Sequence, residues 1–159
     1  MKYEFDVFAD YFQFYVEDEA KPPIDDPGNI WNEQAIADLL ATGPGYISVG
    51  TVRNMTVPVT IEIHPALSED DHMRLLESAD HVVECSLEIT SQRIVVMGCT
   101  DYYPDAPRIP ITSGIYQVRI YYSGLNTLRE NGLEGDDEYR VVLFPGIFVE
   151  PKVLKRGHY

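Results

Sequence analysis

The acidic residues of this sequence gather in four short clusters, and clustered carboxylates can bind a cation, hold a metal ion or transfer a proton. Each cluster stands where the alternation of apolar and polar residues stops, so we expect its carboxylates to lie on loops. The clusters hold 12 of the 26 acidic residues: Glu17, Asp18 and Glu19; Asp25 and Asp26; Glu69, Asp70 and Asp71; Glu134, Asp136, Asp137 and Glu138. Such a surface would attract a cationic partner.

Metal binding is one alternative use of these carboxylates. Asp70, Asp71 and His72 are suitable ligand types for zinc, and so are His64 and His81, but their spacing matches no known zinc pattern. Adjacent aspartates equally suit the N-terminus of a helix. Calcium would require the ordered aspartate spacing of a calcium-binding loop, which the second and fourth clusters lack. We therefore predict no metal ion and no cofactor.

Catalytic motifs are also missing from the sequence. There is no Gly-x-Ser-x-Gly element, and Asp101 close to Cys99 would raise the pKa of that thiol and make it less reactive. Gly43-Pro44-Gly45 lacks the following Lys-Ser/Thr of a phosphate-binding loop. A pair of glycosidase carboxylates is defined by its separation in space, so a carboxylate hydrolase stays open as an alternative. Our prediction is a protein without enzymatic activity.

Composition and charge narrow the class of partner. The 159 residues carry a net charge of -14, which argues against nucleic acid and anionic membranes, because binding to phosphates requires cations. Solubility alone would also account for an acidic composition. With 45% hydrophobic residues, 11 Tyr and 6 Phe, the chain has globular composition, and we expect one domain over residues 1–159. The start has no apolar signal segment, which favours a cytoplasmic protein.

Alternation of apolar and polar residues is the dominant pattern and predicts strands. Val57, Val59 and Ile61, for example, alternate with other residues along one segment, and Phe12, Phe14 and Val16 are expected to share one face of another strand. The predicted strands are residues 2–8, 11–16, 46–51, 56–64, 81–89, 93–99, 115–123, 138–144 and 146–154. Residues 81–89 and 93–99 are expected to pair as a hairpin across Thr90-Ser91-Gln92, with Cys85 and Cys99 as free thiols.

One segment between the predicted strands has a clear helical pattern of apolar residues. Apolar residues predict a helix that begins near Trp31 and ends near Ala41, with Gly43 as its stop. Ser68 and the acidic residues after it are typical of a helix start, so residues 69–78 form either a short helix or a loop. Together these elements predict a mainly β fold: an antiparallel β-sandwich of about eight strands, with the helix covering an end or an edge.

The order of landmarks along the chain resembles the competence protein J family of small bacterial proteins. The resemblance is carried by Tyr11-Phe12-Gln13-Phe14, Pro22-Pro23, Trp31 with Glu33-Gln34-Ala35-Ile36, Gly45-Tyr46-Ile47-Ser48, Arg53-Asn54, Gly114-Ile115-Tyr116-Gln117-Val118-Arg119, Glu138-Tyr139 and Phe144-Pro145. It implies a β-sandwich. It also implies a class of partner, since the family is known for inhibiting a DNA-entry nuclease, whose site is built to accept polyanions.

We therefore predict an acidic binding protein of the bacterial cytoplasm that docks a basic protein, a nuclease or another toxin, through its acidic loops. The residues expected to make the contact come from the charge pattern alone: Asp136, Asp137 and Glu138, supported by Asp25 and Asp26. The alternative is a small-ligand or metal-binding sandwich with a pocket between loops, lined by Tyr102, Tyr103 or His72.

Overall fold

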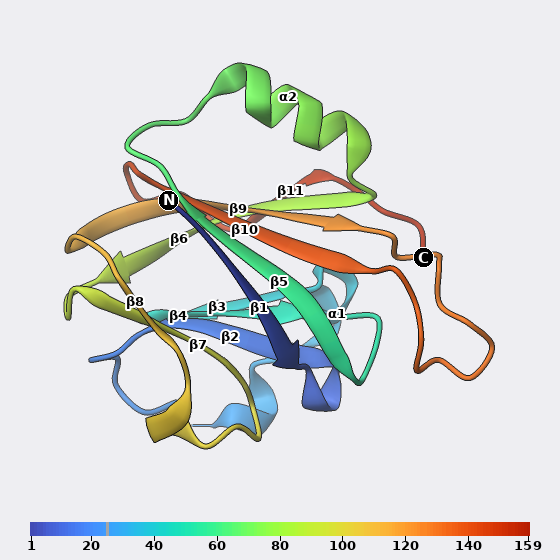
Figure 1. Ribbon diagram of the computed structural model, residues 1–159. Helices are drawn as coiled ribbons and strands as arrows, with labels where there is room; N and C mark the ends of the chain where they lie inside the picture. Colours follow the sequence, from blue (N-terminus) through green and yellow to red (C-terminus); the bar gives the residue numbers. More distant parts are fainter. Residues whose placement is uncertain (25) are drawn as a thin grey trace.

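Two β-sheets lie face to face, and a helix covers the outer face of the larger sheet (Figure 1). This computed structural model describes residues 1–24 and 26–159. In the described residues the six-stranded sheet has the order β1 (Lys2–Phe8), β5 (Thr56–Ile63), β10 (Glu138–Pro145), β9 (Gly114–Ser123), β6 (His81–Ile89) and β11 (Lys152–Lys155). The five-stranded sheet has the order β3 (Leu40–Gly43), β4 (Tyr46–Gly50), β2 (Gln13–Asp18), β7 (Arg93–Gly98) and β8 (Arg108–Pro110). The mainly β fold is confirmed.

Strand direction departs from the prediction at one place. Strands β5 and β10 run parallel, with Tyr139 opposite Val59 and Val141 opposite Ile61, whereas the other paired neighbours are antiparallel. A parallel pair requires a long connection, and β6 to β9 lie between these two strands in the sequence. The alternation of side chains is the same in parallel and antiparallel strands, so the sequence pattern could not predict that β5 and β10 run parallel.

The core lies between the two sheets and follows the predicted alternation. Val57, Val59 and Ile61 of β5 are buried, and Phe14 of β2 packs edge-on against the ring of Tyr139 with 6.0 Å between ring centroids. Each strand thus gives one face to the core and the other to solvent or to the covering helix.

Helix α1 is shorter than predicted. It spans Glu33–Asp38, and Asn32 caps it by accepting a hydrogen bond from the backbone nitrogen of Ala35 at 2.9 Å. Leu39 then adopts a left-handed conformation, with φ at 56°, and this reversal starts β3 at Leu40. The prediction of helix up to Ala41 was wrong, because the helical apolar pattern continues through a residue at which the backbone turns.

Helix α2 spans Glu69–Ser78. Residues 69–78, for which the sequence allowed either a short helix or a loop, are therefore helical. Ser68 caps it by accepting a hydrogen bond from the backbone nitrogen of Asp71 at 3.3 Å. Its apolar side packs onto the outer face of the six-stranded sheet, where Leu75 and Leu76 meet Val82, Tyr121 and Val142. Among the described residues, no helix is long and apolar enough to span a membrane.

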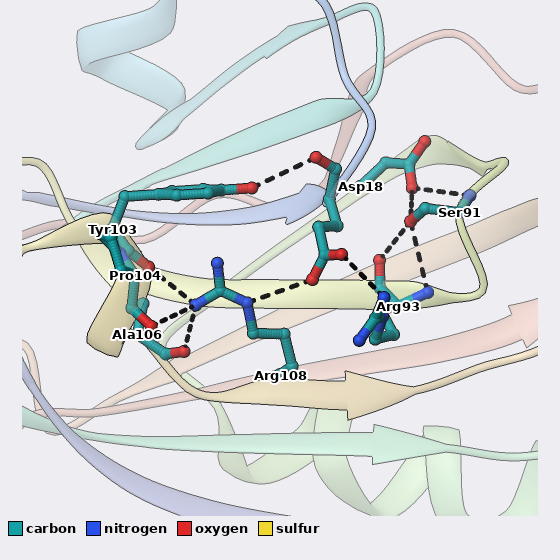
Figure 2. Close-up of polar contacts among 8 residues, drawn as sticks. Asp18, Ser91, Arg93, Tyr103, Pro104, Ala106 and Arg108 are labelled. Atoms are coloured by element: carbon teal, nitrogen blue, oxygen red, sulfur yellow. Dashed lines mark hydrogen bonds and ion pairs between the residues drawn. The ribbon is translucent and has the colours of Figure 1, made fainter.

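The predicted hairpin between residues 81–89 and 93–99 is absent, because β6 and β7 lie in different sheets. The turn between them crosses the sandwich and is held by the buried Asp18. Its carboxylate accepts hydrogen bonds from the backbone nitrogens of Thr90 and Ser91, both at 3.1 Å, and from both hydroxyl groups. Figure 2 shows the bonds from Ser91. Cys85 and Cys99 are both free, and burial raises the pKa of Cys85 to about 12.

Candidate functional site

The first acidic cluster belongs to the interior of the fold, contrary to the expectation of a solvated loop. Glu17 and Asp18 are buried at the end of β2, where Lys21 lies 3.8 Å from Glu17. Glu19 pairs with Arg93 and Arg108, each at 3.1 Å. Glu17 and Glu19 are therefore paired with the protein's own cations, and the buried Asp18 is held by hydrogen bonds from Thr90 and Ser91. This cluster is not part of a binding surface.

Arg108 organises the neighbouring connection (Figure 2). Its guanidinium donates to the backbone oxygens of Tyr103 and Ala106, and lies 4.6 Å from the centre of the Tyr103 ring. The Tyr103 hydroxyl donates to the backbone oxygen of Glu19 at 3.2 Å. Tyr103, which the sequence offered as a pocket residue, thus has structural contacts, while Tyr102 beside it is exposed.

The fourth acidic cluster is divided by the fold. Asp137 is completely buried: its Oδ1 lies 2.8 Å from Nε of Arg53, and its Oδ2 accepts a hydrogen bond from the Tyr139 hydroxyl at 2.7 Å. Burial and the bond to Asp137 raise the pKa of Tyr139, which keeps this hydroxyl a donor. Asp136 and Glu138 on either side are exposed. Asp137 is therefore a structural residue that a docking partner does not reach.

The second acidic cluster lies on the connection between β2 and α1. Asp26 is exposed and accepts a hydrogen bond from Nδ2 of Asn29 at 2.9 Å, and Asp25 lies outside the described residues. The structure brings Asp136 and Glu138 together at the start of β10. Asp26 belongs to a different connection.

Glu138 has an acidic neighbour that the sequence did not suggest. It precedes Tyr139, which is opposite Val59, and Asp6 is opposite Pro58, so Glu138 and Asp6 stand in the same row across β5. The buried Val7 and Tyr139 point inward, and both carboxylates consequently point outward. Two strand spacings place them about 10 Å apart. Asp6, Asp136 and Glu138 are named here the acidic rim.

An exposed aromatic pair lies at the same end of the sandwich. Tyr11 and Phe12 are 69% and 52% exposed, and both have left-handed backbone conformations, with φ at 57° and 60°. Such conformations cost bulky residues about 1–3 kcal/mol each, and they recur at functional sites. The backbone is held by Asn54, whose side chain accepts from the nitrogen of Tyr11 at 2.8 Å, and by Thr51, which donates to the oxygen of Phe12 at 2.9 Å.

The alternation pattern placed Phe12 on the inward face of a strand that starts at Tyr11, and that prediction was wrong. The strand begins at Gln13, and the left-handed turn before it directs both rings outward. One feature of the sequence could have indicated this turn: the predicted strand carries aromatic residues on both of its faces. A strand buried on one face has little reason to carry two large aromatic side chains on the other.

Phe8 and Met55 extend this apolar surface. They are 41% and 38% exposed, and the nitrogen of Ala9 donates to the backbone oxygen of Met55 at 3.0 Å. Phe8, Tyr11, Phe12 and Met55 are named here the aromatic patch. Figure 1 shows that the β1–β2 connection, the β4–β5 connection and the β9–β10 loop gather at the same end of the sandwich.

The patch and the rim are joined through Arg53. This side chain belongs to the β4–β5 connection, next to Asn54 and Met55, and it contacts the β9–β10 loop through Asp137 and through the backbone oxygen of Leu133. The two surfaces therefore lie on segments that are tied to one another. An apolar centre beside charged groups is the usual arrangement of a protein interface.

The charge of this surface is not balanced by nearby cations. Eleven of the 12 lysine and arginine side chains lie within ion-pair distance of a carboxylate. The remaining one, Lys155, donates to three backbone oxygens at the end of α2. Among the described residues, Asp6, Asp136 and Glu138 have no ion-pair partner. The rim thus presents uncompensated negative charge.

Comparisons with known proteins bear on the fold. No protein-family model and no curated protein matches this chain at a significant level. The crystal structure of ComJ from Bacillus subtilis, an inhibitor of the DNA degrading activity of NucA, is similar with a TM-score of 0.63 and 18% identity, over 92% of this chain and 96% of that chain. A protein described as crocagin biosynthetic gene J is similar with a TM-score of 0.57 and 11% identity, over the same shares. The structural resemblance to ComJ is confirmed.

Proposed function

We propose that this protein is a non-enzymatic inhibitor that docks a basic protein of the nuclease kind through the aromatic patch and the acidic rim. The observation that carries the proposal is the exposed Tyr11–Phe12 pair, held in a strained conformation beside carboxylates without ion-pair partners. The fold shared with ComJ, which inhibits a nuclease, supports the class of partner.

The two surfaces would contribute different parts of the binding. Long-range attraction between the acidic rim and a basic partner raises the association rate, and this effect weakens as salt screens the charges. Aromatic side chains in the centre of an interface supply contact area at a small entropic cost and slow dissociation. A nuclease presents cations because it must bind phosphates, so the rim would occupy a site made for a polyanion.

Of the five partner-contact residues predicted from the sequence, Asp136 and Glu138 are exposed and belong to the proposed docking surface. Asp6 replaces Asp137, which is buried. Asp25 and Asp26 are secondary contacts for a partner that extends to the connection before α1.

The experiment is depletion of DNA-degrading activity from a native lysate by the immobilised protein at low salt. The wild-type protein should retain a nuclease, and the eluted nuclease should be inhibited in solution as the protein is added up to an equal molar amount. The immobilised Phe12→Asn variant should bind little of the nuclease activity from the lysate. The matched control is Phe148→Asn, which removes an exposed phenylalanine from the connection after β10 and should retain as much as the wild type. Passage of all nuclease activity through the wild-type column would contradict the proposal.

A further inference from the structure

Strand β1 is the margin of the six-stranded sheet and, in the part of the chain that the structure describes, pairs with β5 alone (Figure 1). The backbone nitrogen of Ile63 donates to the oxygen of Met1 at 2.9 Å, so these opposite residues are a hydrogen-bonded pair. In an antiparallel ladder such pairs alternate with pairs that exchange no hydrogen bond. The register along β1 is unbroken, so the backbone groups of Lys2, Glu4 and Asp6 point away from β5.

This edge of β1 is open to another strand. Among residues 1–24 and 26–159, no backbone hydrogen bond joins Lys2, Glu4 or Asp6 to a segment other than β5. The open stretch ends at Phe8, whose carbonyl oxygen lies so close to Gly98 of β7 that a side chain at Gly98 would clash with it. Before that point, each of the three residues offers one donor and one acceptor.

The core is also incompletely covered at this margin. Tyr3 and Phe5 of β1 pack on the core but are only partly buried. Ile61 and Val59, which lie opposite them on β5, are at most 1% exposed. A strand added along β1 would therefore cover apolar surface of Tyr3 and Phe5 as well as satisfy the backbone groups.

The outward side chains determine which strand fits. Glu4 lies 3.3 Å from Lys2 in a solvent-exposed ion pair, and Asp6 has no ion-pair partner among the described residues. Charged residues on an edge strand prevent indiscriminate pairing, and acidic ones favour a neighbour that carries cations on the same face. Asp6 belongs to the acidic rim and Phe8 to the aromatic patch, so this edge continues the proposed docking surface.

We propose that β1 receives an extended segment of the basic partner as an additional strand of the sheet. The inference rests on the proposed function, because it names the element through which the same partner docks. The segment carries Lys or Arg at alternate positions, opposite Glu4 and Asp6, and apolar residues between them that cover Tyr3 and Phe5. In this mode of recognition the main-chain hydrogen bonds provide affinity and the alternating side chains provide specificity.

A second copy of this chain fits the edge less well. In the antiparallel register that pairs Lys2 with Asp6 of the other copy, Glu4 faces Glu4. Like charges directly opposite each other destabilise a strand pair, and each copy carries a net charge of -14. A basic segment meets neither obstacle.

The test uses a short capped peptide of alternating lysine and valine as the probe, with the glutamate–valine peptide as its control, at constant ionic strength. Amide NMR signals of the wild-type protein are followed during titration, and hydrogen exchange is measured with and without the probe. We expect saturable shifts along β1, and exchange of the Glu4 and Asp6 amides slowed by about tenfold or more at saturation, because a paired amide exchanges when its bond opens. The glutamate–valine peptide should change neither.

A pair of variants separates backbone pairing from charge. Glu4→Pro removes the N–H that points away from β5, and an edge strand tolerates proline at such a position. Glu4→Ala removes the same carboxylate but keeps the N–H. Glu4→Pro should bind the lysine–valine peptide at least about tenfold more weakly than Glu4→Ala, because it loses a hydrogen bond and its ring obstructs the added strand. Glu150→Ala, which removes an exposed carboxylate from the segment after β10, should bind nearly as the wild type does.

The inference is overturned if the lysine–valine peptide leaves the exchange of the Glu4 and Asp6 amides unchanged, or if Glu4→Pro and Glu4→Ala bind it equally. If Glu4→Pro does not fold, the exchange measurement on the wild type decides. Nuclease capture is scored separately. Equal capture by the wild type and both Glu4 variants would contradict the inference and leave the proposed function standing. Failure of the wild type to capture a nuclease would contradict the proposed function, and the peptide titration would still decide the inference.

Discussion

Arg53 and Asp137 form a buried ion pair, with 2.8 Å between Nε and Oδ1, that joins the β4–β5 connection to the start of β10. The pair fixes the loop that carries Asp136 against the segment that holds Tyr11 through Asn54. Internal charge pairing therefore positions the uncompensated charges of the acidic rim.

Asp137→Ala should destabilise the fold. The substitution leaves the largely buried Arg53 side chain without its carboxylate and the Tyr139 hydroxyl without its acceptor. Breaking a buried pair in this way typically costs about 3–5 kcal/mol of unfolding free energy. Urea denaturation measures this loss. Asp136→Ala, one residue away on the surface, should change stability by no more than about 0.5 kcal/mol. A loss below about 1 kcal/mol for Asp137→Ala would show that the pair does not hold the loop.

Phe12→Asn should separate stability from binding. Asparagine tolerates the left-handed conformation better than phenylalanine, so the substitution should leave the unfolding free energy unchanged or raise it by about 1 kcal/mol. It should also speed dissociation of the captured nuclease by about tenfold or more, because it removes an exposed aromatic anchor. Denaturation and dissociation rates are measured on the same sample. Unchanged dissociation would assign Phe12 no part in docking, and a large loss of stability would show that its ring packs in the fold.

His81 should make stability depend on pH. Its ring is fully buried, with Nε2 donating to the backbone oxygen of Asp38 at 2.8 Å and Nδ1 accepting from the nitrogen of Gly157 at 3.0 Å. Burial lowers its pKa below the ordinary 6.5, so the unfolded chain binds the proton first. Stability is therefore complete above pH 6.5 and falls as the pH decreases below it, by up to about 1.4 kcal/mol per pH unit from this group.

The pH prediction is checked by urea denaturation of the wild type and of His81→Gln between pH 8 and about pH 5. The variant should be less stable at high pH, and the difference between the two proteins should shrink as the pH falls. His72, whose pKa burial also lowers, contributes in the same direction in both proteins and cancels in the comparison. A difference that stays constant over this range would mean that His81 does not titrate differently in the two states.

The sequence predicted those parts of the structure that depend on local pattern. The alternation in β5 and the cap at Ser68 both correspond to what the structure contains. The pattern could not tell that β6 and β7 belong to different sheets, because period two describes a strand and not its partner. The helix end at Leu39 and the turn at Tyr11 and Phe12 depend on left-handed backbone conformations that these residue types rarely adopt.

The candidate site was predicted only in its general character for a related reason. In the sequence Glu19 belongs to an acidic cluster. In the structure it forms ion pairs with Arg93 and Arg108, which are more than 70 residues away along the chain. Asp137 is indistinguishable in the sequence from Asp136, yet one is buried and the other exposed. Which carboxylates keep their charge uncompensated is decided by contacts between distant segments, and Asp6 joins the rim for the same reason.

The most direct measurement is the association rate of the captured nuclease at low and at high salt, with wild-type protein and with Asp6, Asp136 and Glu138 all changed to lysine. The control changes Glu88, Asp105 and Glu150 to lysine, three exposed residues outside the rim that shift the net charge equally. The account predicts that the rim variant associates at least about tenfold more slowly at low salt and loses most of the salt dependence, while the control stays close to the wild type. Equal association rates for the rim variant and the control would contradict it.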